Sequence, residues 1–120
     1  MKRVLIVDDS KFARIILRKM LEESGFEIVA EAETDVEAVE KYKQFRPDLV
    51  TMDIILPIEN GLKAVKEIIA FDSQAKIIMV SAMGQEKIVE EALQLGAKGF
   101  VVKPISREKL INEVNKVINS

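Results

Sequence analysis

Residues 49–57 read LVTMDIILP, an apolar, β-prone run that reaches one carboxylate and then breaks at a proline. The run predicts a buried strand that delivers Asp53 to the rim of a sheet, because Pro57 cannot donate the hydrogen bond that would continue the strand. One strand that ends on an acid is common, since strands end where the chain meets water. The interpretation therefore depends on what ends the other strands.

The rest of the chain alternates apolar runs with segments of helical spacing. Short apolar runs bounded by turn residues predict strands at 4–7, 49–52, 76–81 and 99–103, and a shorter, more polar run at 27–31 predicts an edge strand. Apolar residues at helical spacing predict helices at 11–23, 36–45, 62–71, 85–95 and 107–119. Strands that are apolar throughout and are joined by helices predict an α/β fold, a doubly wound parallel sheet of five strands. Residues 1–120 are expected to form a single domain.

Composition excludes several classes of function. The chain is 48% hydrophobic and 32% charged, as in globular proteins, and its net charge of −2 gives no reason to expect nucleic acid or an anionic membrane as a partner. It has no cysteine and no histidine, so it supplies no disulfide, histidine base or phosphohistidine. No apolar run approaches the length of a membrane span, and a cytoplasmic location is expected.

Charged and polar side chains follow four of the five predicted strands. Asp8 and Asp9 follow the first strand, Asp53 the third, Ser81 the fourth and Lys103 the fifth. In a parallel α/β sheet, ligands bind beyond the carboxyl ends of the strands, where the strand order reverses. We therefore expect three carboxylates, a hydroxyl and an ammonium group to converge on one rim.

This arrangement predicts a bound cation. Clustered aspartates repel one another unless a cation lies among them, and Lys103 can offset only one of the three charges. Carboxylates, a backbone carbonyl and waters are the ligands that usually hold Mg²⁺. We expect Asp9 and Asp53 to bind Mg²⁺ directly, Asp8 to act through water, and the backbone carbonyl of Ile55 to be a third protein ligand.

Beside Mg²⁺, Asp53 can act as a nucleophile toward phosphorus. The product would be an aspartyl phosphate, and Lys103 would help to neutralise the charge on the transferring group. Ser81 could donate a hydrogen bond to a phosphoryl oxygen that exists only in the modified protein.

Four segments at these strand ends resemble those of the receiver domain of two-component response regulators. They are VDD at 7–9, MD at 52–53, VSA at 80–82 and VKP at 102–104. The resemblance covers the whole chain and implies a flavodoxin-like (βα)5 fold with strand order 2-1-3-4-5. It also implies an acidic pocket at Asp8 and Asp9, a phosphoacceptor at Asp53 and an essential lysine at Lys103.

The resemblance further implies a switch and a set of partners. Ser81 and Phe100 would be the switch residues, and the peptide bond between Lys103 and Pro104 would be cis. Because the domain accounts for all 120 residues, the chain is most similar to the stand-alone chemotaxis regulators. We expect a monomer, not a classical enzyme, that takes its phosphoryl group from a CheA-like sensor histidine kinase. It would then bind the flagellar motor switch through its fourth helix, fifth strand and fifth helix.

Three alternatives remain open at this stage. The chain could be a phosphorelay intermediate or the receiver domain of a larger transcriptional regulator. It could be a phosphatase of the haloacid dehalogenase type, but those enzymes have a second acid two residues after the nucleophile, where this chain has Ile55. A flavin carrier would need a phosphate-binding loop after the first strand, where Asp8 and Asp9 would repel phosphate.

The chain departs from the best-known receiver domains at three positions. Phe100 stands where a tyrosine is frequent, so the aromatic ring has no hydroxyl to offer a partner. Ile55 and Met83, two residues after Asp53 and Ser81, are apolar where some relatives have polar groups that help water to attack the phosphoryl group. We therefore predict slow autodephosphorylation.

Overall fold

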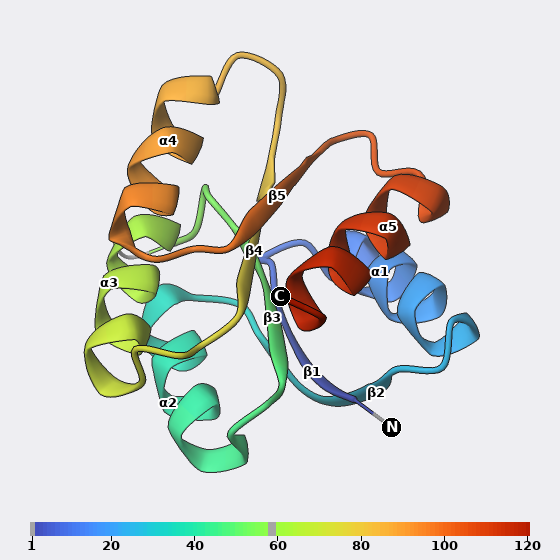
Figure 1. Ribbon diagram of the computed structural model, residues 1–120, viewed down its shortest axis with the longest axis horizontal. Helices are drawn as coiled ribbons and strands as arrows, with labels where there is room; N and C mark the ends of the chain where they lie inside the picture. The colour runs from blue at the N-terminus through green and yellow to red at the C-terminus, as the bar shows by residue number, and fades with distance from the viewer. Residues whose placement is uncertain (1, 58–59) are drawn as a thin grey trace.

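Five strands alternate with five helices along the part of the chain that the structure describes (Figure 1). The structure is a computed structural model that describes residues 2–57 and 60–120. The strands are β1 (Arg3–Val7), β2 (Glu27–Ala32), β3 (Leu49–Asp53), β4 (Ile77–Ser81) and β5 (Gly99–Val102). The helices are α1 (Lys11–Glu23), α2 (Asp35–Phe45), α3 (Gly61–Phe71), α4 (Glu86–Leu95) and α5 (Arg107–Ile118).

The strands form one parallel sheet in the order β2-β1-β3-β4-β5, which confirms the predicted fold and strand order. The register pairs Val7 with Met52 and Ser81 with Val102. Because the strands are parallel and in this register, the carboxyl ends of β1, β3, β4 and β5 lie along one edge of the sheet. The strand order reverses at β1 and β3, where a ligand site is expected.

Helices cover both faces of the sheet. Helices α1 and α5 lie on one face, and α2, α3 and α4 lie on the other (Figure 1). Each layer has its own hydrophobic core: Leu17 and Leu110 are fully buried in the first, and Met52 and Ile68 in the second. No helix within residues 2–57 and 60–120 combines the length and the apolar character that crossing a membrane requires.

Local sequence explains where the helices begin. Ser10 and Asn60 are the N-caps of α1 and α3, and their side-chain oxygens accept backbone N–H groups of Ala13 and Lys63. The predicted bounds of every element are within one residue of the observed ones. Lys103, predicted as the last residue of the fifth strand, instead follows β5, because the chain turns toward Pro104 there.

The apolar residues of α1 divide into two groups that helical spacing alone does not separate. Leu17 and Leu21 are buried against the sheet, whereas Phe12 is 73% exposed and Ile15 is 55% exposed. The first turns of α1 therefore present apolar side chains to solvent beside the rim that carries Asp8.

Candidate functional site

Three carboxylates meet at the carboxyl ends of β1 and β3. Oxygen atoms of Asp8, Asp9 and Asp53 all lie within 4.8 Å of one another. Asp53 is the last residue of β3 and is 7% exposed, Asp8 follows β1 and is 1% exposed, and Asp9 is exposed. The structure thus brings together the three acids that the strand-end pattern placed at one rim.

Lys103 reaches into this acidic group from the end of β5. Its Nζ atom lies 3.4 Å from Oδ2 of Asp53 and 3.5 Å from Oδ2 of Asp8. The Lys103 N–H donates to the carbonyl of Ser81 at 2.7 Å, which holds the chain next to β4. The peptide bond between Lys103 and Pro104 is cis, as the resemblance implies.

Burial and neighbouring charges together shift the pKa values of Asp53 and Lys103. Burial raises the pKa of Asp53, and the charge of Asp8 raises it further, while Lys103 and the Ile55 N–H oppose the rise. Burial disfavours the charged form of Lys103, but the charges of Asp53 and Asp8 outweigh burial and raise the pKa of Lys103. The pocket therefore has an excess of negative charge that its own lysine does not neutralise.

The pocket fits a small divalent cation. Oδ1 of Asp8 accepts the Ser10 N–H at 2.9 Å, whereas the buried Oδ2 atom of Asp8 has no hydrogen-bond partner. Oδ1 of Asp53 accepts the Ile55 N–H at 3.3 Å. Carboxylate oxygens that converge within 4.8 Å, one of them buried and paired only with the Lys103 ammonium among the described residues, suit Mg²⁺ better than a softer metal.

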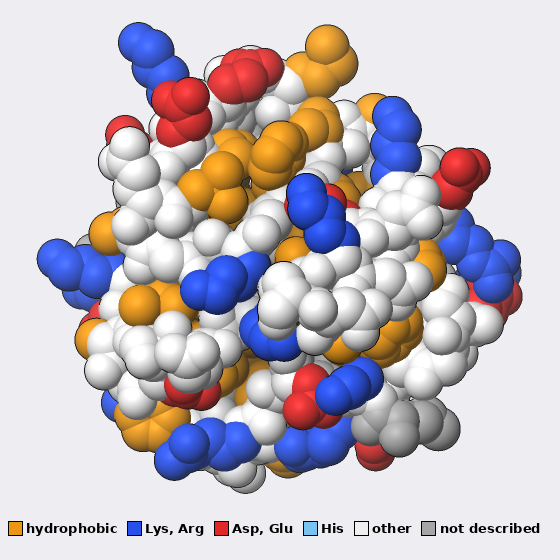
Figure 2. All heavy atoms as spheres, in the orientation of Figure 1, with side chains coloured by type: hydrophobic (Ala, Val, Ile, Leu, Met, Phe, Trp, Pro, Cys, Tyr) orange, Lys and Arg blue, Asp and Glu red, His pale blue; other side chains and the backbone are white. Residues whose placement is uncertain are grey.

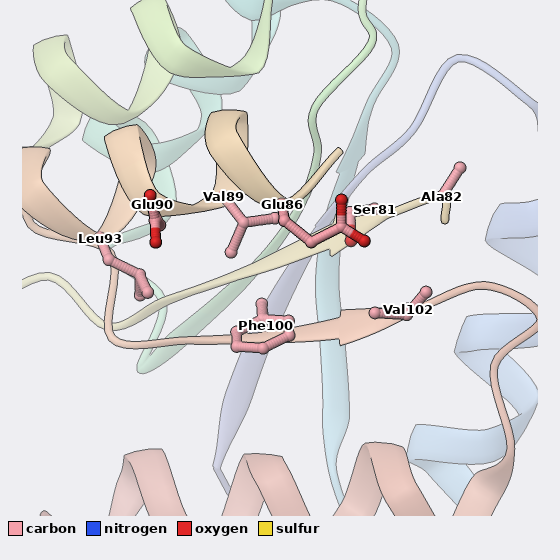
Figure 3. Close-up of a pocket in the computed structure, with 8 residues that line it drawn as sticks. All are labelled: Ser81, Ala82, Glu86, Val89, Glu90, Leu93, Phe100 and Val102. Carbon is pink, nitrogen blue, oxygen red and sulfur yellow. The ribbon is translucent and has the colours of Figure 1, made fainter. Parts of the chain in front are cut away.

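Ser81 and Phe100 lie at a second pocket, which extends from the rim between α4 and β5 (Figure 3). Ser81 is 2% exposed, and within residues 2–57 and 60–120 its Oγ atom makes only a long contact of 3.5 Å, with the Val101 carbonyl. Phe100 is 44% exposed. The pocket has a volume of about 330 Å³ and is walled on the α4 side by Val89 and Leu93. A loosely held hydroxyl and a half-exposed ring therefore border the same space.

An apolar surface surrounds this second pocket. Figure 2 shows hydrophobic side chains gathered where α4 and β5 lie in Figure 1, with acidic and basic side chains around them. Phe100, Val102 and Leu93 are among the large hydrophobic residues exposed in this region. Met83 and Ile55, two residues after Ser81 and Asp53, are 81% and 59% exposed, and neither side chain carries a polar group.

Three contacts of the site lie outside what sequence reasoning could find. The Gly61 N–H donates to the Ile54 carbonyl at 2.8 Å, with the glycine Cα packed against the backbone of Asp53. A guanidinium N–H of Arg14 donates to the Asp8 carbonyl. No motif marks either residue. The one local signal for the Gly61 contact is a glycine at the first position of a helix, because a residue without a side chain lets another backbone segment approach closely.

A sequence model described as the response regulator receiver domain matches residues 4–115. The chain belongs to this family. It is 52% identical to the chemotaxis protein CheY of Bacillus subtilis over 117 residues, which cover 98% of each chain. It is 51% identical to CheY of Thermotoga maritima, with 97% of each chain covered. Its fold matches the CheX–CheY–BeF3–Mg²⁺ complex of Borrelia burgdorferi with a TM-score of 0.93 and 42% identity, covering 97% of this chain and 88% of that one.

These relatives fit the geometry already described. The chain is a CheY-like receiver domain of a two-component response regulator, and the matched residues include all four strand ends that carry the site. The acidic group at Asp8, Asp9 and Asp53 is consistent with Mg²⁺ binding by such a domain.

Proposed function

We propose that the protein is a phosphorylation-activated switch, a single receiver domain over residues 1–120 that acts as a monomer in the cytoplasm. A CheA-like sensor histidine kinase donates the phosphoryl group to Asp53, and the phosphorylated form binds a downstream protein, the flagellar motor switch in chemotaxis. The observation that carries this proposal is the convergence of Asp8, Asp9 and Lys103 on the buried carboxylate of Asp53.

The proposed chemistry is a phosphoryl transfer in which the protein supplies position and charge. An oxygen of Asp53 attacks phosphorus, and the bond from phosphorus to the imidazole nitrogen of the donor breaks. Asp9, Asp53 and the Ile55 carbonyl would hold Mg²⁺, with Asp8 acting through water, and the bound ion would supply positive charge beside the transferring group. The Nζ atom of Lys103 already lies 3.4 Å from Oδ2 of Asp53, so it can form an ion pair with a phosphoryl oxygen once Asp53 is phosphorylated.

The proposed output is a rearrangement at the pocket between α4 and β5. Ser81 Oγ makes only a 3.5 Å contact with Val101, so a phosphoryl oxygen on Asp53 can compete for its proton at little cost. Movement of Ser81 toward Asp53 opens the end of the pocket that Phe100 borders, and the ring turns inward. The population of the α4–β5–α5 surface then shifts toward the form that binds the target.

Intact mass after incubation with acetyl phosphate tests the transfer. We expect one phosphoryl group to be added to the wild-type protein when Mg²⁺ is present. None should be added when Mg²⁺ is chelated or when Asp53 is replaced in an Asp53→Asn variant. A phosphoryl group that still appears on the variant, or without a divalent cation, would contradict the assignment of the acceptor or of the metal.

Slow loss of the phosphoryl group is a separate prediction. Ile55 and Met83, two residues after Asp53 and Ser81, have exposed apolar side chains that cannot orient an attacking water. We expect the phosphorylated protein to decay over minutes or longer after removal of the donor. An Ile55→Asn variant should decay about tenfold faster, the effect of one added hydrogen bond to that water. A wild-type lifetime of seconds would count against this explanation.

A further inference from the structure

Arg14 connects the acidic pocket to a network of charges on α1 and β2. Its Nη1 atom donates to the backbone carbonyl of Asp8 at 2.8 Å, and its Nε atom donates to Oε1 of Glu31 at 2.8 Å. The Arg14 side chain is 11% exposed, so these bonds form in a partly dehydrated setting. Arg18 binds the other oxygen of Glu31 at 2.6 Å, and its remaining hydrogen bond with the described residues goes to Glu22, so Arg14 alone of the two reaches the backbone of the pocket.

The bond from Arg14 completes the constraints on Asp8. The Asp8 N–H donates to the Ala32 carbonyl at 3.0 Å, and Oδ1 of Asp8 accepts the Ser10 N–H at 2.9 Å. The Asp8 carbonyl, held by Arg14, belongs to the planar peptide unit that joins Asp8 to Asp9. The same contact therefore orients the chain at both acids.

We propose that Arg14 is a positioning residue for the divalent cation: it fixes the Asp8–Asp9 peptide so that both carboxylates face the metal position. The inference rests on the proposed function, because it assumes that the pocket binds Mg²⁺. With its backbone groups and Oδ1 held, Asp8 directs Oδ2 into the pocket, where this buried oxygen makes no hydrogen bond with the described residues and lies 3.5 Å from the Lys103 ammonium.

The sign of the effect separates positioning from simple electrostatics. Arg14 carries a positive charge near a cation site, so its removal would tighten Mg²⁺ binding if charge alone mattered. Loss of positioning has the opposite sign, because groups that orient metal ligands typically contribute about tenfold or more to affinity. The pairing of Arg14 with Glu31 and Glu33 also reduces its net electrostatic effect on the pocket.

Calorimetric titration of the full chain with MgCl₂ tests the proposal. We expect Arg14→Ala to weaken Mg²⁺ binding by about tenfold. Arg14→Lys should also bind weakly, because an ammonium group cannot hold the carbonyl and Glu31 together as the guanidinium fork does. Arg18→Ala is the matched control: it removes a cation from the same glutamate, and its affinity should equal or slightly exceed that of the wild type.

Two further readouts separate positioning from a general loss of structure. Raising the Mg²⁺ concentration should restore the rate at which Arg14→Ala reacts with acetyl phosphate, since the defect lies in metal affinity. The Ser10 amide should exchange its hydrogen faster in metal-free Arg14→Ala than in metal-free Arg18→Ala. Unchanged or tighter Mg²⁺ binding by Arg14→Ala, or equal losses in the two variants, would overturn the proposal. If the wild-type protein bound no Mg²⁺, both the proposed function and the metal role of Arg14 would be overturned. If Arg14→Ala were phosphorylated and bound Mg²⁺ as tightly as the wild type, only the role of Arg14 would be overturned.

Discussion

Replacement of Gly61 by alanine is expected to destabilise the protein by about 3 kcal/mol, the upper part of the usual range for overpacking. An added Cβ would collide with the carbonyl oxygen of Asp53 and would lie 3.1 Å from Cα of Ile54. These are backbone atoms of β3 and of the loop that follows it, so no side-chain rotation can relieve the contact. The higher helix propensity of alanine offsets at most about 1 kcal/mol at this first position of α3.

The same substitution should also weaken the site, because the strain falls on the peptide of Asp53 itself. Denaturant unfolding of the Mg²⁺-free protein measures the loss of stability, and calorimetric titration measures the loss of Mg²⁺ affinity. Gly99→Ala is the control. There the new Cβ meets side-chain atoms instead: the carboxylate of Glu113, which can move at the cost of its 3.0 Å hydrogen bond from the Phe100 N–H, about 1 kcal/mol, and Cγ2 of Val117 at 3.0 Å. A Gly61→Ala variant no less stable than Gly99→Ala would contradict the steric argument.

The fold and the main site residues could be predicted because each rests on a local pattern. An apolar run that ends at Asp53 and a second that ends before Lys103 define strands whatever their partners are. Parallel pairing then brings their carboxyl ends to one edge, so the neighbours of Asp53 follow from topology. The pattern needs no knowledge of side-chain packing, which is why the predicted bounds agree with the structure, whereas the strand order comes from the resemblance to receiver domains.

Contacts that join distant elements through side chains could not be predicted in this way. Nothing in the helical spacing of α1 distinguishes Phe12, which is exposed, from Leu17, which is buried, because the spacing does not show where the sheet ends. Arg14 looks like an ordinary solvent-facing residue of an amphipathic helix. Its role depends on Glu31 lying beside α1 on the edge strand β2, which only the folded structure shows.

The Asp53→Asn variant is expected to be more stable than the wild type by about 1–3 kcal/mol near neutral pH when Mg²⁺ is absent, the usual cost of leaving a buried polar group without adequate partners. Burial and the charge of Asp8 raise the pKa of Asp53 in spite of Lys103, so the net environment disfavours the ionised form. The folded protein therefore binds this proton more tightly than the unfolded chain does. The stability associated with that proton is fully present below the ordinary pKa of 3.8 and is lost as the pH rises through the raised value.

Unfolding free energies measured with a chelator across this pH range should show the two proteins converging in acid and separating toward neutral pH. Asp72→Asn supplies a control of opposite sign. The hydrogen bond from the Tyr42 hydroxyl, 2.7 Å long, holds the pKa of Asp72 below its usual value, so this carboxylate stabilises the fold when ionised and its replacement should destabilise it. A general benefit from reduced negative charge would instead stabilise both variants, which would contradict the assignment of the effect to the pocket.

Saturating Mg²⁺ should stabilise the wild-type protein more than the Asp53→Asn variant. A cation that binds only the folded state adds about 2.7 kcal/mol to its stability when present at a hundred times its dissociation constant. The wild-type pocket gains this in full, because all three converging carboxylates are present to hold the cation. The Asp53→Asn variant lacks one of the three converging carboxylates and gains less. If Mg²⁺ stabilised both proteins equally, Asp53 would not be a ligand, and the pocket would bind its cation through Asp8 and Asp9 without it.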